Sequence, residues 1–208
     1  MTALSPNADR RGVAWSTETG DPGLAAPLRA RLRDGSTVVV RGCSPADEQA
    51  LSDFLAGLCL EARRLRFFTG AVDIKRSAHS GAASGDDRIG LVALDEDGVL
   101  VAHAVCIELE AGRAEVAVEV ADAMHGRGLG TILIEELAEI AERRGISKLV
   151  AEVLPENKAM IEVFRDGFDA VITWTEGVDR VEFPAASWRL ARERYGAWQD
   201  KARSFPQR

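Results

Sequence analysis

The segment "AEVAVEVADAMHGRGLGTILIEELAEIAERR" (114–144) decides the fold, because its pattern changes abruptly in the middle. Its first part, residues 114–121, has the alternating pattern of a β-strand. Its last part, residues 129–144, carries apolar residues at helical spacing, and a glycine follows it. The turn between them lacks side chains at alternate positions, which are Gly126, Gly128 and Gly130. The segment therefore predicts a strand, a tight glycine-rich turn and a long helix.

The glycine-rich turn matches neither of two common phosphate-binding patterns. A P-loop has the pattern GxxxxGK[ST], and "GRGLGT" lacks both that spacing and the lysine. A dinucleotide-binding turn has GxGxxG, whereas the spacing here is GxGxG. A third possibility is a pyrophosphate cradle of another kind, in which the unpaired N–H groups at the helix start hold a phosphate and Arg127 adds a charged hydrogen bond. A tight turn without a ligand is the alternative.

The rest of the chain predicts a sheet around this segment. Residues 89–121 contain three apolar runs separated by the turns "DEDG" and "EAGR", which favours an antiparallel meander. Together the predicted elements indicate an α+β domain of the three-layer α/β kind, with a mixed, mostly antiparallel sheet flanked by helices. The other predicted elements are a strand at 36–43, a helix at 44–68, a mobile loop at 69–88, a strand at 147–154, a short helix at 155–166, and a hairpin around 176–178.

The chain of 208 residues is long enough for one domain with its own core. We expect a flexible N-terminal tail over 1–34, with a short helix at 24–33, because this part has no sustained hydrophobic period. The domain itself is expected over 35–185, and a helical C-terminal tail over 186–208.

Composition narrows the class of partners. A net charge of −7 argues against a general nucleic-acid binder, which would carry a basic face. Three cysteines without CxxC spacing and three scattered histidines predict no metal site. The chain lacks a signal-peptide pattern and any apolar run long enough to cross a membrane, so a cytoplasmic protein with no membrane partner is expected.

The glycine turn and the later segment "VLPENKAM" (153–160) resemble the core of the GNAT acyltransferase superfamily. The family motif Gln/Arg-x-x-Gly-x-Gly/Ala is matched by "HGRGLG", with His125 in the first position, and Asn157 matches an asparagine that follows the next strand. The opening segment, residues 32–68, is similar to bacterial protein-lysine acetyltransferases. The resemblance covers residues 32–184.

The resemblance implies that acetyl-CoA binds at this turn and that no metal is needed. Its pyrophosphate would lie on the N–H groups of residues 126–131, and its pantetheine arm would run beside Val118 and Val120. Asn157 would contact the cofactor, and His125 would either hold a phosphate as a cation or simply form part of the turn. The residues of the implied phosphate site are His125, Gly126, Arg127, Gly128, Leu129, Gly130 and Thr131.

Acetyl transfer to an amine needs a base, because an amine such as lysine is almost wholly protonated at pH 7. Glu115 is the leading candidate, since lysine acetyltransferases of the superfamily often carry a glutamate at this place. Glu119 is the rival, because residues 115 and 119 share one face of an unbroken strand. Burial at the start of the strand would raise the pKa of Glu115 toward neutrality, and if the two carboxylates are close, one of their pKa values rises because like charges resist joint ionisation. Many members of the superfamily have a tyrosine as general acid where this chain has Phe164.

The resemblance therefore predicts an acetyl-CoA-dependent N-acetyltransferase that transfers the acetyl group directly to an amine, here a protein lysine side chain. One alternative is acetylation of a small-molecule amine. Another is a catalytically weak acyl-CoA-binding module that regulates a partner, which the absence of the tyrosine would favour.

Overall fold

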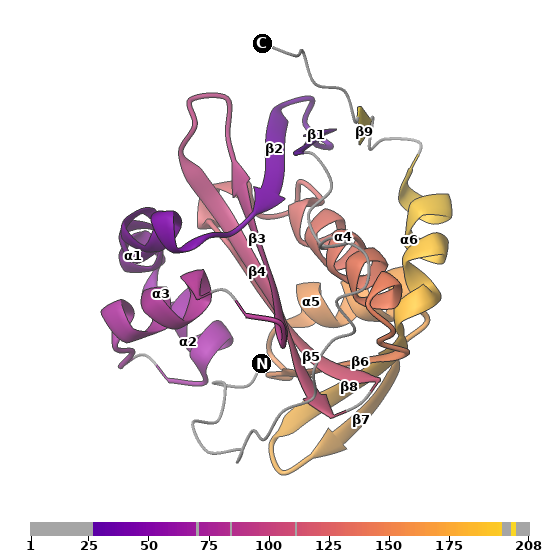
Figure 1. Ribbon diagram of the computed structural model, residues 1–208. Helices are drawn as coiled ribbons and strands as arrows, with labels where there is room; N and C mark the ends of the chain where they lie inside the picture. Colours follow the sequence, from indigo (N-terminus) through magenta and orange to yellow (C-terminus); the bar gives the residue numbers. More distant parts are fainter. Residues whose placement is uncertain (1–26, 70, 84, 111, 197–200, 203–208) are drawn as a thin grey trace.

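The computed structural model describes residues 27–69, 71–83, 85–110, 112–196 and 201–202. Its strands form one sheet in the order β7-β8-β6-β5-β4-β3-β2-β1-β9, and each neighbouring pair is antiparallel except β5 and β6 (Figure 1). The predicted mixed, mostly antiparallel sheet is confirmed. The strands are β1 (Leu28–Arg31), β2 (Thr37–Gly42), β3 (Arg88–Leu94), β4 (Leu100–Glu110), β5 (Arg113–Val120), β6 (Lys148–Val153), β7 (Val171–Thr175), β8 (Val178–Pro184) and β9 (Lys201–Ala202).

Helices cover both faces of the sheet, which gives the three layers (Figure 1). One face carries α4 (Leu129–Arg143) and α6 (Trp188–Tyr195), and the other carries α1 (Glu48–Gly57), α2 (Leu60–Phe67) and α3 (Ile74–Ala82). A short α5 (Lys158–Glu162) continues into a single π-helical turn, Val163–Gly167. Single 3-10 turns occur at Pro45–Asp47, Asp122–Met124 and Ala185–Ser187.

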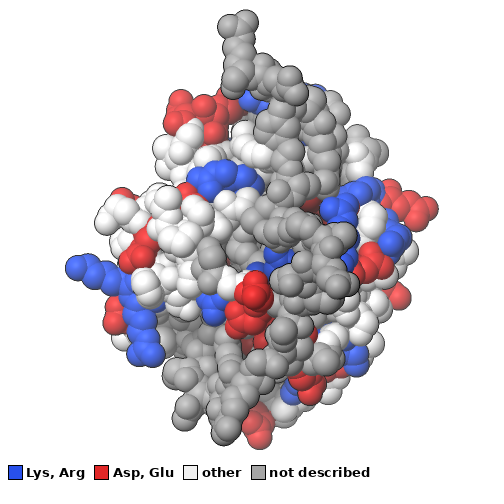
Figure 2. Space-filling model, in the orientation of Figure 1, with Lys and Arg blue, Asp and Glu red and all other residues white. Residues whose placement is uncertain are grey.

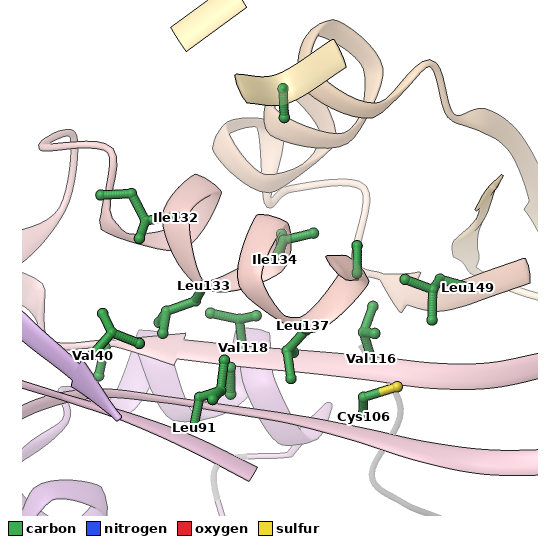
Figure 3. Close-up of a cluster of buried hydrophobic side chains, with 14 of the residues drawn as sticks. Val40, Leu91, Cys106, Val116, Val118, Ile132, Leu133, Ile134, Leu137 and Leu149 are labelled. Atoms are coloured by element: carbon green, nitrogen blue, oxygen red, sulfur yellow. The ribbon is translucent and has the colours of Figure 1, made fainter. Parts of the chain in front are cut away.

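The main core lies between α4 and the sheet. Leu133 and Leu137 of α4 point toward Val116 and Val118 of β5 and toward Leu91 of β3 (Figure 3). These five side chains are at most 6% exposed. Burying each of them stabilises the fold by about 1.5–3 kcal/mol, which fixes the helix and hence the glycine turn at its start.

The outer face of α4 is buried as well, although it is acidic. Arg192 of α6 lies over this face, and its Nε and Nη2 atoms are 2.7 Å and 2.6 Å from carboxylate oxygens of Glu135 and Glu139. Charge pairing thus lets α6 cover a helix that is buried on nearly every side. The predicted helix in the C-terminal tail, 186–208, is confirmed where residues 188–195 form α6 and is wrong at residues 201–202, which pair with β1 as β9. Residues 197–200 and 203–208 lie outside the described residues.

Residues 28–31 form a strand, so the predicted short helix at 24–33 is wrong where the structure describes it. Leu28 and Ala30 are buried and alternate with the exposed Arg29 and Arg31, which is the period of a strand. The sheet therefore begins inside the segment expected to be a flexible tail. Residues 1–26 of that tail lie outside the described residues.

The predicted mobile loop at 69–88 is also wrong in its central part, because residues 74–82 form α3. Asp73 caps the helix by accepting a hydrogen bond from the backbone N–H of Arg76 at 3.1 Å. The buried face of α3 carries Ala78 and Ala82, and small residues allow α3 to pack closely against α1. A Cβ at Gly81 would lie 2.7 Å from Cδ2 of Leu51.

The predicted helix at 44–68 is divided. It ends as α1 at Gly57 and begins again as α2 at Leu60, because Leu58 adopts an extended backbone with ψ of 140°. The side chain of Cys59 caps α2, and Asp122 accepts a hydrogen bond from the Cys59 N–H at 3.1 Å. The break lets α2 turn toward β5, where the candidate site lies. In the ranges that the structure describes, every helix is too short or too polar to cross a lipid bilayer.

Candidate active site

The site is opened by the separation of two parallel strands. β5 and β6 pair over only three residue pairs, from Arg113 with Lys148 to Glu115 with Val150. β5 then continues to Val120 and β6 to Val153, so the edge of β5 beyond residue 115 faces a gap instead of a partner strand. An extended ligand would find backbone groups there with which to pair.

A pocket of about 580 Å³ lies at this separation. Residues of α2, β5, the glycine turn, α4, α5 and the π-helical turn line it, together with Leu58 between α1 and α2 and one residue near each end of the described domain. The lining residues used below are Arg33, Leu65, Arg66, Val118, Glu119, Val120, His125, Gly126, Gly128, Leu129, Gly130, Thr131, Glu156, Asn157, Glu162, Asp166 and Tyr195.

The glycine turn forms one end of the pocket, and α4 starts at Leu129 as predicted. Gly126 and Gly128 have φ of +73° and +89°, a region that side chains disfavour. Gly128 is the N-cap of α4 and offers no capping side chain, so the first N–H groups of the helix lie open to a ligand. A Cβ at Gly130 would meet only Cε of Met160, at 3.8 Å, which leaves room for a phosphate above the turn.

Two polar residues of the turn make contacts within the fold. Nε2 of His125 donates to the carbonyl oxygen of Val120 at 3.0 Å, so this ring holds the turn against the end of β5. Arg127 lies outside the lining set and forms an ion pair with Asp34, with Nη1 and Oδ2 2.7 Å apart. The charged hydrogen bond from Arg127 to a phosphate stays a prediction, and it would compete with this ion pair.

Asn157 lies on the opposite wall. Its Oδ1 accepts a hydrogen bond from the N–H of Met160 at 3.3 Å and so caps α5. The cap holds the amide at the pocket, where the sequence placed it.

Glu119 is part of a buried charge cluster with Arg66 and His103. Its Oε2 lies 2.6 Å from Nε of Arg66, and its Oε1 accepts a hydrogen bond from Nδ1 of His103 at 2.7 Å. Burial alone would raise the pKa of Glu119, but the positive charges of Arg66 and His103 outweigh it and lower the pKa to about 2. Burial would lower the pKa of His103, but the charge of Glu119 raises it to about 9. Glu119 and His103 are therefore both charged at pH 7.

Comparison with known proteins agrees with this geometry. The model of the acetyltransferase (GNAT) family matches residues 60–168, more than half of the chain. The chain belongs to the GNAT family. The crystal structure of the GNAT domain of Streptomyces lividans PAT is 34% identical, has a TM-score of 0.69, and aligns over 76% of this chain and 96% of that domain.

Two more distant structures share the fold. A phosphinothricin acetyltransferase from Sinorhizobium meliloti, solved in complex with AcCoA, is 16% identical, has a TM-score of 0.55, and aligns over 71% of this chain and 88% of that one. A cAMP-binding acyltransferase from Mycobacterium smegmatis is 22% identical, has a TM-score of 0.55, and aligns over 81% of this chain and 55% of that one.

The other candidate base, Glu115, lies at the closed end of the strand separation. It shares the face of β5 that Glu119 occupies, as predicted, but four residues separate them by about 13 Å along the strand. Glu115 is half-buried and outside the lining set, whereas Glu119 lines the pocket. The pKa of Glu119 lies well below neutrality, which does not suit a general base at pH 7.

The place of the GNAT tyrosine is filled by a core residue. Phe164 is 2% exposed and packs against Phe183, with ring centroids 5.3 Å apart. Tyr195, the single tyrosine of the chain, reaches the pocket from α6 instead. Within the described part of the chain, no cluster of three or more His, Cys, Asp or Glu side chains is arranged to hold a metal ion.

Arg33, Arg66 and Tyr195 are among the lining residues that the sequence did not predict as part of the site. The alternation of Leu28, Ala30 and Leu32 would have predicted the strand that brings Arg33 to the turn. No local pattern marks Arg66 or Tyr195, since both reach the site through long-range packing.

Proposed function

We propose that this GNAT protein uses acetyl-CoA to acetylate an amine, and that the amine is a lysine side chain of another protein. The observation that carries the proposal is the glycine turn at the mouth of the β5–β6 separation, which offers helix N–H groups to phosphates and a strand edge to an extended arm. The resemblance of residues 32–68 to bacterial protein-lysine acetyltransferases supports the choice of lysine. A net charge of −7 favours a cationic acceptor (acidic and basic side chains alternate on the face in Figure 2).

Acetyl-CoA would supply the activated thioester. The residues of the turn would hold its phosphates, and Val118 and Val120 would flank its arm, as their places in the lining set suggest. The amine nitrogen attacks the thioester carbon, a C–N bond forms as the C–S bond breaks, and the proton of the amine goes to a base.

We assign the role of base to Glu115, which lies where β5 and β6 part, the closed end of the space that the arm would follow. Glu119 is a poor base because its proton affinity is suppressed by Arg66 and His103. Phe164 has no proton to give, so the leaving thiolate would take its proton from water.

The test is an acetylation assay on a lysine-containing peptide, in which the rate is measured from the release of free CoA. Glu115→Gln is expected to lower kcat by a factor on the order of 10²–10⁴ while acetyl-CoA affinity stays unchanged. Glu110→Gln, which changes an exposed glutamate at the end of β4, is the matched control and should keep the wild-type rate. A loss of less than threefold in Glu115→Gln would remove Glu115 as the base.

The same assay with a panel of small amines separates a protein acceptor from a small-molecule acceptor. A second candidate function is a catalytically weak acyl-CoA-binding module, which the buried Phe164 favours. That function predicts acetyl-CoA binding without turnover on any amine.

We also propose that the protein works in the cytoplasm. Cys43, Cys59 and Cys106 are free thiols, as expected in a reducing compartment.

A further inference from the structure

The mouth of the pocket is bordered by both ends of the described domain. Arg33 lies two residues after the end of β1, and Tyr195 is the last residue of α6. Both line the pocket that the glycine turn closes at one end. Two segments that the sequence placed in terminal tails therefore meet at the proposed phosphate site.

Two contacts hold the turn after β1 against the glycine turn. The N–H of Arg33 donates to the carbonyl oxygen of Arg127 at 3.0 Å, and the next residue, Asp34, forms an ion pair with the Arg127 side chain. These two contacts fix the backbone of Arg33 beside the phosphate-binding residues. They also keep Arg127 away from the pocket, so the arginine that borders the pocket at this turn is Arg33.

The side chain of Arg33 is directed by Tyr195. Its guanidinium carbon lies 5.9 Å from the centre of the Tyr195 ring, within the range of a cation–π contact. The ring itself is confined, because a Cβ at Gly167 would lie 3.2 Å from its Cε2 atom. A long, exposed arginine is thus held over one aromatic face at the mouth of the pocket.

The carboxylates around the pocket favour a cation at this place. Carboxylates of Glu156, Glu162 and Asp166 line the pocket, and they oppose a ligand with several phosphates. Among the described lining residues the arginines are Arg33 and Arg66, and Arg66 is 5% exposed in the cluster with Glu119, whereas Arg33 is exposed at the mouth of the pocket. A guanidinium matches phosphate oxygens with two parallel hydrogen bonds, which makes Arg33 the suited partner.

We propose that Arg33 binds a phosphate of the nucleotide end of CoA and that Tyr195 is the positioning residue that holds Arg33 there. The inference rests on the proposed binding of acetyl-CoA. The phosphate is either the diphosphate, which would lie on the glycine turn, or the 3′-phosphate of the ribose.

Calorimetric titration of the full chain with CoA and with 3′-dephospho-CoA tests the proposal and distinguishes the two phosphates. Arg33→Gln is expected to weaken CoA binding tenfold or more, the usual size of a lost hydrogen bond between charged groups. An equal loss for dephospho-CoA assigns the diphosphate, and a loss confined to CoA assigns the 3′-phosphate. Arg29→Gln is the matched control, because it removes the same charge from β1 at a residue outside the lining set.

Tyr195 is tested by rescue. Tyr195→Phe retains the ring and should bind CoA like the wild type, whereas Tyr195→Leu removes the ring and should reproduce the loss in Arg33→Gln. In the double variant Arg33→Gln with Tyr195→Leu, the second change should add nothing. A merely structural role of Tyr195 would instead lower the melting temperature and leave the affinity of the folded protein unchanged.

The proposal is overturned if Arg33→Gln binds CoA within twofold of both the wild type and Arg29→Gln. In that case wild-type binding still stands, and the proposed function stands with it. If the wild type binds no CoA, both the inference and the proposed function fail.

Discussion

The buried cluster of Glu119, Arg66 and His103 makes stability depend on pH in a direction that can be worked out. The pKa of His103 is raised from 6.5 to about 9 by the charge of Glu119, in spite of burial. A raised pKa means that the stabilisation is fully present below pH 6.5 and is lost as pH rises through about 9. A rise of about 2.5, at about 1.4 kcal/mol per pKa unit, corresponds to roughly 3 kcal/mol.

Glu119→Gln removes the negative charge that keeps the His103 imidazole protonated. At neutral pH the buried Arg66 then lacks its carboxylate, which typically costs about 3–5 kcal/mol. His103 next to Arg66 should then be neutral above pH 6.5, because burial disfavours its charged form. The variant should therefore be less stable at pH 7 but should no longer lose stability between pH 6.5 and 9.

Urea unfolding at steps of half a pH unit from pH 6.5 to 9 measures both the stability at pH 7 and the slope of stability against pH. Glu115→Gln on the same strand is the matched control and should keep the wild-type slope, since about 13 Å separates it from the cluster. Above pH 9 the buried thiol of Cys106 adds its own loss, because burial raises its pKa to about 12, so the comparison stops there. A wild type of constant stability over this range, or an equal slope in Glu119→Gln, would refute the reasoning.

Two further predictions concern packing. Gly81→Ala should lower the free energy of unfolding, measured in urea, by about 1–3 kcal/mol, because the new Cβ would lie 2.7 Å from Leu51. Gly57→Ala is the control and should be neutral or slightly stabilising, because no atom lies within 4 Å of its Cβ, and equal effects of the two changes would contradict the close packing of α3 on α1. Arg192→Ala should lower the free energy of unfolding by about 3–5 kcal/mol, because Arg192 pairs with the buried carboxylates of Glu135 and Glu139. Arg189→Ala removes an exposed ion pair and should lower it by at most about 1 kcal/mol, and a difference below 1 kcal/mol between the two variants would show that other contacts hold α6.

The central part of the fold could be predicted because its patterns are local. The meander, the glycine turn and α4 each carry a clear period or a clear turn within one short segment. The strand β1 was missed because its arginines hide a short alternation, and α3 was missed because its buried face is built from alanines that resemble loop composition.

Only part of the site could be predicted from the sequence, because some of its residues are brought together by long-range packing. The turn and Asn157 are recognised from their own neighbours in sequence. The protonation of Glu119 depends on His103 and on Arg66, which lies 53 residues away, and these partners are brought together only by the sheet and by α2. Arg33 and Tyr195 meet at the pocket through the same kind of long-range packing.

The claim that the glycine turn binds the phosphates of acetyl-CoA is tested most directly by calorimetric titration of acetyl-CoA into the wild type and into Gly128→Glu. This change places a carboxylate at the helix start and forces a side chain onto a φ of +89°. Gly98→Glu is the control, because Gly98 has a similar φ of +79° in the β3–β4 turn, outside the pocket. We expect the wild type and Gly98→Glu to bind acetyl-CoA with micromolar affinity and Gly128→Glu not to bind it. Binding retained by Gly128→Glu, or absent from the wild type, would contradict it.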